Sequence, residues 1–127
     1  LGLAYNGLGQ HERAIDFHQQ RLAIAREVGD RQGEGNALGN LGITYEKLGD
    51  YTQAVDYAEQ SLTVAREIGD RRGEGAGLRE LGVALLRQDF TTKALENLQA
   101  ALDISQEVKS PSDEAETLKT WQNCIRH

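Results

Sequence analysis

The chain has 127 residues, of which 39% are hydrophobic, 27% are charged and 6% are aromatic. This length fits one domain, and so few aromatic residues leave little material for a large enzyme pocket. The 20 acidic and 14 basic residues give a net charge of -6, which disfavours general binding to nucleic acid or to an anionic membrane surface.

The composition also bears on where the protein works. No apolar run approaches the roughly 20 residues that a membrane-spanning helix needs, and residues 1–9 lack the basic start and apolar stretch of a signal peptide. Cys124 is the single cysteine, so no internal disulfide can form. These features predict a reducing, cytoplasmic location. Because the sequence contains no methionine, we expect it to be part of a longer protein.

The sequence repeats itself every 40 residues. When residues 1–40 are placed on residues 41–80, 19 of the 40 positions are identical. The segment 22–35 returns almost unchanged at 62–75. A third, more divergent copy follows, in which Ala94 repeats Ala54 and Leu102 repeats Leu62. Tandem duplication explains this agreement, and it predicts that each unit folds in the same way.

Each unit contains two stretches with the apolar period of a helix. In the second unit one stripe includes Leu38, Leu41 and Tyr45, and another begins at Ala54. No segment alternates with a period of two. The prediction is an all-α fold, an α-solenoid of tandem helix-turn-helix repeats with a C-terminal capping helix. In chain order, the helices are expected near 1–8, 11–28, 31–48, 51–68, 71–88, 91–108 and 111–126.

Glycine followed by aspartate marks the predicted turns. Gly49 can adopt the left-handed conformation that ends a helix, and Asp50 can cap the next helix with Gln53 three residues later. The same pair recurs at 29–30 and 69–70. Ser110 and Pro111 are typical of a cap followed by the first helical position. The chain is therefore expected to form a single domain over 1–127, with repeats near 1–30, 31–70 and 71–110 and a terminal helix at 111–126.

Several patterns that resemble catalytic or ligand sites have simpler structural explanations. The glycines at 33–35 and 73–77 follow a helix rather than a strand, which argues against a phosphate-binding loop. The three histidines, His11, His18 and His127, show no metal-ligand spacing with each other, and Cys124 lies near the terminus without enough ligands for zinc. Nothing supplies Cys124 with an orienting base and an oxyanion site. We expect no enzyme activity, no cofactor and no metal.

Charged residues recur at the predicted turns and are interpreted as solvated helix ends. Arginine and glutamate repeat at 26–27 and 66–67, and aspartate and arginine at 30–31 and 70–71. Glu67 and Arg71 are expected to pair across the turn. Surface pairs of this kind contribute little individually, typically under about 1 kcal/mol.

The helical unit with Leu38, Leu41-Gly42, Tyr45, Ala54 and Ser61 resembles the tetratricopeptide repeat. The longer period is similar to the roughly 40-residue form found in bacterial signalling arrays, Pins-type polarity proteins and kinesin light chains. The chain departs from the family pattern in places. His18 and Ala58 replace a large aromatic residue, Leu85 replaces the tyrosine of the third unit, and Asp89 replaces its turn glycine.

Glycines inside the predicted helices fit this resemblance, because an interior glycine costs up to about 1 kcal/mol relative to alanine. At Gly42 and Gly82 we expect a neighbouring helix to lie almost on the backbone. At Gly39 we expect the missing side chain to keep a concave groove open.

The resemblance implies that the first helix of each repeat lines a concave groove that binds a peptide or a partner segment. Asparagine carboxamides can both donate and accept hydrogen bonds, and so could hold a peptide main chain. The implied peptide-binding residues are Asn6, Asn36, Gly39, Asn40, Ile43, Glu46, Lys47, Ala76, Arg79, Glu80, Val83, Leu86 and Arg87. Chaperone-type carboxylate binding is not expected, because Ala76 and Glu80 stand where that subtype places cations.

Three functional hypotheses follow from this reading. The favoured one is a non-catalytic protein-protein interaction scaffold with a protein or peptide partner and no nucleic-acid or membrane partner. A second is a regulatory sensor region of a larger signalling enzyme or ATPase. The third is a self-assembling structural unit that joins end to end, since Leu1, Leu3 and Leu8 would be left uncovered.

Overall fold

The computed structural model describes the backbone of residues 3–108 and 111–126 and the side chains of 9–108, 111–112 and 114–123. It contains six helices and, over these residues, no strand, which confirms the predicted all-α class. The helices are α1 (Leu3–Val28), α2 (Arg31–Leu48), α3 (Tyr51–Ile68), α4 (Arg71–Arg87), α5 (Thr91–Glu107) and α6 (Pro111–Arg126).

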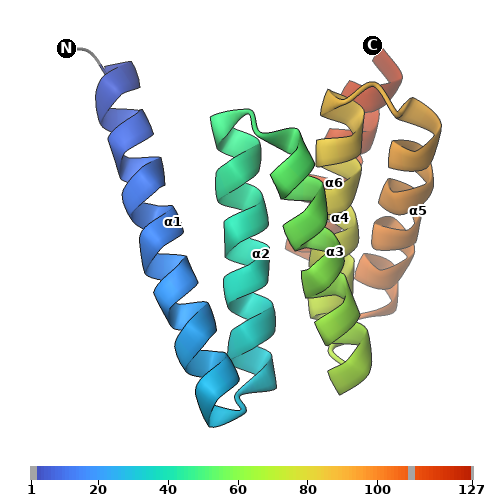
Figure 1. Ribbon diagram of the computed structural model, residues 1–127. Helices are drawn as coiled ribbons and strands as arrows, with labels where there is room; N and C mark the ends of the chain where they lie inside the picture. The colour runs from blue at the N-terminus through green and yellow to red at the C-terminus, as the bar shows by residue number, and fades with distance from the viewer. Residues whose placement is uncertain (1–2, 109–110, 127) are drawn as a thin grey trace.

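The helices are arranged as a two-layered array (Figure 1). Each helix packs against the next one in the chain, and α2 also contacts α4, which in turn contacts α6. The helices α2, α4 and α6 therefore form one layer, and α1, α3 and α5 form the other. This is the stacking of a helical solenoid, in which each unit buries its apolar face against its neighbours.

The predicted glycine-aspartate turns are confirmed at each of the three positions. Gly29, Gly49 and Gly69 have φ values of 75°, 86° and 72°, a left-handed conformation that favours glycine. At the N-terminus of α3, the carboxylate of Asp50 accepts a hydrogen bond from the amide of Gln53 at 3.2 Å. The aspartates at 30 and 70 cap α2 and α4 in the same way, each at 2.9 Å.

The turn between α4 and α5 uses different residues for the same purpose. Asp89 adopts a φ of 67° where the other turns have glycine. The N-cap of α5 is Phe90, whose side chain makes no capping hydrogen bond. The third unit thus makes the same kind of turn as the second, but without the glycine and the capping aspartate that favour it. The expected cap at Ser110 lies outside the described residues.

The first turn predicted from the repeat is absent, because α1 is one continuous helix rather than separate helices at 1–8 and 11–28. Gly9 corresponds to Gly49 but lies inside the helix without a positive φ. Gln10 replaces Asp50, and so no carboxylate is present to cap a new helix. The loss of this cap gives a physical reason for the helix to continue through Gly9.

The core runs along the array in two clusters. One is centred on Leu38 and Leu41, which are 1% and 0% exposed, and the other joins α3, α4 and α5. Close helix approach at Gly42 and Gly82 is confirmed. A Cβ atom at Gly42 would lie 3.4 Å from the carbonyl oxygen of Ala54, and one at Gly82 would lie 2.8 Å from Cγ of Leu98.

Candidate functional site

A groove of about 510 Å³ lies over α2 and between its neighbouring helices. Its floor is formed by one side of α2, and its walls come from α1, α3 and α4. Five of the implied peptide-binding residues line it: Asn36, Gly39, Asn40, Ile43 and Ala76. A Cβ atom at Gly39 would lie 3.3 Å from Oγ of Ser61, so the absence of a side chain there widens the groove.

The groove presents hydrogen-bonding groups beside apolar surface. Asn36 and Asn40 are exposed on α2, and Ile43 is 39% exposed one turn later. At one end, the amide of Gln32 donates to the carboxylate of Asp70 at 3.2 Å and to the side-chain oxygen of Asn36 at 3.3 Å. Exposed carboxamides next to an apolar side chain can bind the main chain and one side chain of an extended segment.

Sequence reasoning missed Phe17 and Arg21 in the wall that α1 contributes. Phe17, His18 and Arg21 line the groove; Phe17 is 54% exposed, and Cζ of Arg21 lies 5.7 Å from the centroid of its ring. Burial, and secondarily the charge of Arg21, lowers the pKa of His18. The family pattern assigns peptide contacts to first helices, whereas α1 carries these residues in a second-helix position. In the repeat, His18 stands where the next unit has Ala58, and Arg21 stands where it has Ser61. These two differences were the sequence signals that could have indicated this wall.

Four other implied residues form a separate polar cluster where α2 passes α4. The pKa of Glu80 is raised to about 7, mainly by burial and then by the nearby charge of Glu46, while Arg79 and Lys47 act in the opposite direction. One carboxylate oxygen of Glu80 is buried and has no hydrogen-bond partner. This cluster is not part of the groove lining.

The remaining implied residues are dispersed. Val83 and Leu86 are half-buried on α4, and Arg87 is exposed at the end of that helix. None of the three lines the groove described above. The side chain of Asn6 lies outside the described residues, as do those of Leu1, Leu3 and Leu8.

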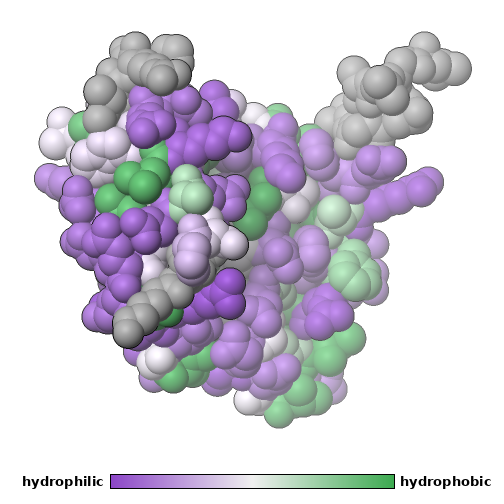
Figure 2. Space-filling view, turned by 180° about the vertical axis from the view of Figure 1, so that it is seen from behind, coloured by the Kyte–Doolittle hydropathy of each residue, from purple (hydrophilic) through white to green (hydrophobic). Residues whose placement is uncertain are grey.

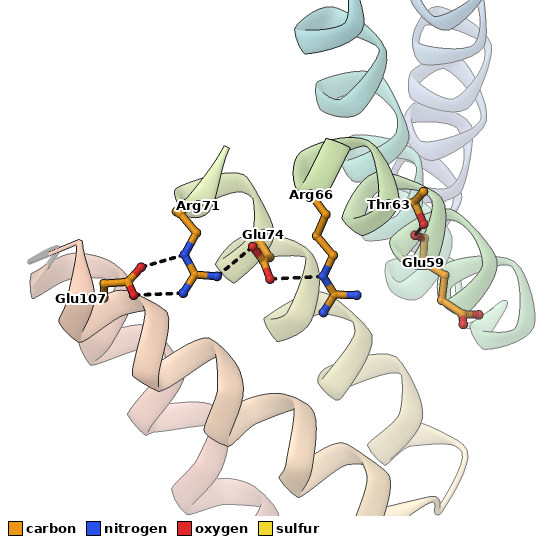
Figure 3. Close-up of polar contacts among 6 residues, drawn as sticks. All are labelled: Glu59, Thr63, Arg66, Arg71, Glu74 and Glu107. Atoms are coloured by element: carbon orange, nitrogen blue, oxygen red, sulfur yellow. Dashed lines mark hydrogen bonds and ion pairs between the residues drawn. The ribbon is translucent and has the colours of Figure 1, made fainter. Parts of the chain in front are cut away.

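Arginine and glutamate side chains form a ladder along the turns that join the repeats (Figure 3). Arg71 pairs with Glu107 at 2.7 Å and with Glu74 at 2.9 Å, and Arg66 also reaches Glu74 at 3.2 Å. One unit earlier, Arg26 and Arg31 pair with Glu34, and Arg31 also contacts Glu67. The repeat thus reproduces its ion pairs as well as its core.

This ladder corrects one prediction from the sequence. Glu67 pairs with Arg31 of the preceding turn, and Arg71 pairs across α4 and α5, instead of the two pairing with each other. Burial acts to raise the pKa of Glu34 and of Glu74, but hydrogen bonds from two arginines to each carboxylate outweigh it. The pKa of both carboxylates is therefore lowered.

The rear surface of the molecule is mostly hydrophilic, with hydrophobic patches that include the side on which α1 lies (Figure 2). Within the part of the chain that the structure describes, no helix is both long and apolar enough to cross a membrane. Over the same residues, no three histidine, cysteine, aspartate or glutamate side chains gather as metal ligands. Cys124 and His127 are outside that comparison, because their side chains are not described.

Comparison with known proteins gives two results. A family model described as "Tetratricopeptide repeat" matches residues 1–67. A 41-residue segment is 51% identical to the proteins named G-protein-signaling modulator 1 from Homo sapiens, Mus musculus and Rattus norvegicus. That segment is 32% of this chain and 6% of each relative, so the chain spans only a small part of their length. With the family model matching more than half of its residues, and with six stacked helices repeating every 40 residues, the chain belongs to the tetratricopeptide repeat family.

Proposed function

We propose that this domain is a non-catalytic scaffold that binds an extended segment of a partner protein in the groove over α2. Tetratricopeptide repeats generally mediate protein-protein interactions, which supports the class of function. The observation that carries the proposal is the groove of about 510 Å³ in which Asn36 and Asn40 stand beside the exposed Ile43.

The chemistry of the groove indicates what kind of segment it binds. The carboxamides of Asn36 and Asn40 are spaced by one helical turn, so they can contact successive parts of a main chain without selecting its side chains. Ile43 and Phe17 offer apolar contact, while Arg21 and Asp70 place opposite charges around the groove. We therefore expect a short segment with at least one apolar side chain and a mixed charge pattern.

The names of the relatives suggest the cellular process in which this domain acts. The matched proteins are named modulators of G-protein signalling, and we propose that this domain likewise serves a signalling assembly in the cytoplasm.

Peptides selected from a random displayed library provide the probe for this proposal. We expect selected peptides to bind the wild-type domain and to lose about tenfold in affinity in the variant Asn36→Ala/Asn40→Ala, because two hydrogen-bonding side chains are removed. Isothermal titration calorimetry measures both affinities. The matched control is Glu59→Ala/Thr63→Ala on the exposed side of α3, away from the groove.

The expected control result is unchanged affinity. If the control pair abolishes binding while the groove pair leaves it intact, the peptide binds another face and the groove assignment is wrong. Chemical-shift changes in the amide spectrum on peptide addition should centre on α2 and on Phe17, which maps the site independently of the variants.

A further inference from the structure

Gln32 is a groove residue at which two otherwise similar copies of the repeat differ. Residues 26–35 and 66–75 differ at only two positions. One change is conservative, and the other places Gln32 where the later copy has Arg72. The residues that the two copies share include those of the turns and of the ion-pair ladder, whereas Gln32 lines the groove. This difference indicates that Gln32 serves the groove rather than the packing of the array.

The side chain of Gln32 joins Asp70 to Asn36 through a single nitrogen atom. Nε2 of Gln32 donates to Oδ2 of Asp70 at 3.2 Å and to Oδ1 of Asn36 at 3.3 Å. Gln32 and Asn36 are one turn apart on α2, whereas Asp70 is the N-cap of α4. All three residues line the groove, so these hydrogen bonds connect two helices across one end of it.

The carboxylate of Asp70 sets the direction of these hydrogen bonds. An ionised carboxylate only accepts, so Gln32 must face it with its amide nitrogen and not with its oxygen. Asp70 is itself held in place, because its Oδ1 accepts from the amide of Gly73 at 2.9 Å. The same nitrogen of Gln32 faces Asn36 and requires the oxygen of that side chain. The amino group of Asn36 is therefore the part that remains to donate to a molecule in the groove.

We propose that Gln32 and Asp70 are positioning residues, which hold Asn36 as a hydrogen-bond donor to a main-chain carbonyl group of the bound segment. This inference rests on the proposed function and adds a direction to it. A carboxamide that turns freely loses that freedom when a segment binds, whereas a carboxamide that is already held does not. Asn40, one turn further along α2, takes no part in these hydrogen bonds and provides an internal comparison.

A double-mutant cycle tests the positioning role, with one peptide selected on the wild-type domain as the probe for every variant. Gln32→Met keeps the length and neutrality of the side chain and removes both hydrogen bonds. We expect it to weaken binding about threefold in the wild-type domain and in Asn40→Ala. In Asn36→Ala it should have no effect, because the side chain that it positions is gone. Isothermal titration calorimetry measures each affinity.

The matched control for this cycle is Gln99→Met on the exposed side of α5. Gln99 also donates to a carboxylate, that of Asp103 at 2.9 Å, but it does not line the groove, so affinity should be unchanged. Equal losses from Gln32→Met in Asn36→Ala and in Asn40→Ala, or no loss in the wild-type domain, would overturn the positioning role and leave the groove assignment standing. Wild-type affinity in the Asn36→Ala/Asn40→Ala variant would instead overturn the proposed function, and this inference with it.

Asp70→Asn tests the direction of the hydrogen bonds. Asparagine also caps a helix, but it can donate as well as accept, so Gln32 and Asn36 are no longer held in one orientation. We expect about threefold weaker binding, measured with the same peptide. The repeat supplies the control, because Asp30 caps α2 through the same bond to the amide of Gly33, at 2.9 Å, and does not line the groove. Asp30→Asn changes the charge equally and should leave the affinity unchanged. Equal losses in the two variants would show that net charge governs binding, and would contradict the proposal.

Discussion

The helices α1 and α3 occupy equivalent places in the repeat but have different surroundings. Val64 on α3 is 4% exposed and lies so close to α2 that a Cβ atom at Gly35 would be 3.2 Å from its Cγ1, whereas Ile24 on α1 is 58% exposed. Their sequences are nearly the same over this stretch. The difference shows that burial in a repeat array is set by the helix that packs against a residue, and not by the residue's own helix.

Matched alanine substitutions give the largest expected effect and test this comparison directly. Val64→Ala removes two buried methyl groups next to a rigid backbone, and should lower the free energy of unfolding by about 2 to 3 kcal/mol. Ile24→Ala should lower it by less than about 0.5 kcal/mol, because the side chain is mostly exposed. Chemical denaturation of both variants measures the difference. Similar losses at the two sites would mean that the α1 face is covered in solution.

Asn40 and Glu80 extend the comparison to the layer formed by α2 and α4. They are equivalent in the repeat, yet Asn40 is exposed and Glu80 is largely enclosed by the side chains at the α2–α4 contact. The folded state raises the pKa of Glu80 to about 7 from an ordinary 4.5. Folding therefore favours the protonated carboxyl group, and stability should fall as pH rises from about 4.5 to 7.

Replacing this carboxylate should remove the pH-dependent cost. Glu80→Gln mimics the protonated form, so it should raise the free energy of unfolding by about 2 kcal/mol at pH 8 and leave it nearly unchanged at pH 4. Urea unfolding at the two pH values measures the effect. Glu59→Gln, on the exposed side of α3, is the control and should show no such difference between pH values. A gain of equal size at both pH values would show that Glu80 is not titrating as described.

The architecture was predictable because the same turn residues and the same apolar spacing recur in each unit. Glycine and aspartate placed the turns at 29–30, 49–50 and 69–70, and the spacing of Leu38 and Leu41 identified the buried stripe. The first turn was mispredicted for a local reason: Gly9 matches the pattern, but Gln10 cannot cap. A single glycine is too weak a signal to end a helix without the residue that follows it.

The candidate groove was only partly predictable. Asn36, Asn40 and Ile43 follow from their position on a first helix, since their side chains point away from the core stripe. The contribution of Phe17 depends on how α1 packs against the other helices. The sequence around Phe17 does not indicate this packing. Arg79 and Glu80 were expected to face the groove, but the contact between α2 and α4 places them in a cluster of their own.

The turn before α5 provides a smaller test of the same comparison. Asp89 holds a left-handed conformation that glycine adopts at no steric cost in the other turns. Asp89→Gly should therefore stabilise the protein by about 1 kcal/mol, reduced by the greater freedom of glycine in the unfolded chain. Thermal unfolding monitored by circular dichroism measures the change. A lower melting temperature would indicate that the side chain of Asp89 makes a contact that outweighs the backbone strain.

The smallest expected effect concerns Gly9 and Gly49, which are equivalent in sequence and opposite in conformation. Gly9 lies within α1 with nothing within 4 Å of an added Cβ atom, so Gly9→Ala should stabilise the protein by about 0.5 kcal/mol through helix propensity. Gly49 has a φ of 86°, and Gly49→Ala should destabilise it by about 1 kcal/mol, because the left-handed conformation penalises a side chain. Denaturant unfolding of the two variants gives the signs. If both substitutions are destabilising, residue 9 forms a turn in solution and α1 is divided as the repeat predicts. Opposite signs mean that the same glycine position adopts two conformations in the repeat. The conformation is then selected by whether aspartate or glutamine follows the glycine.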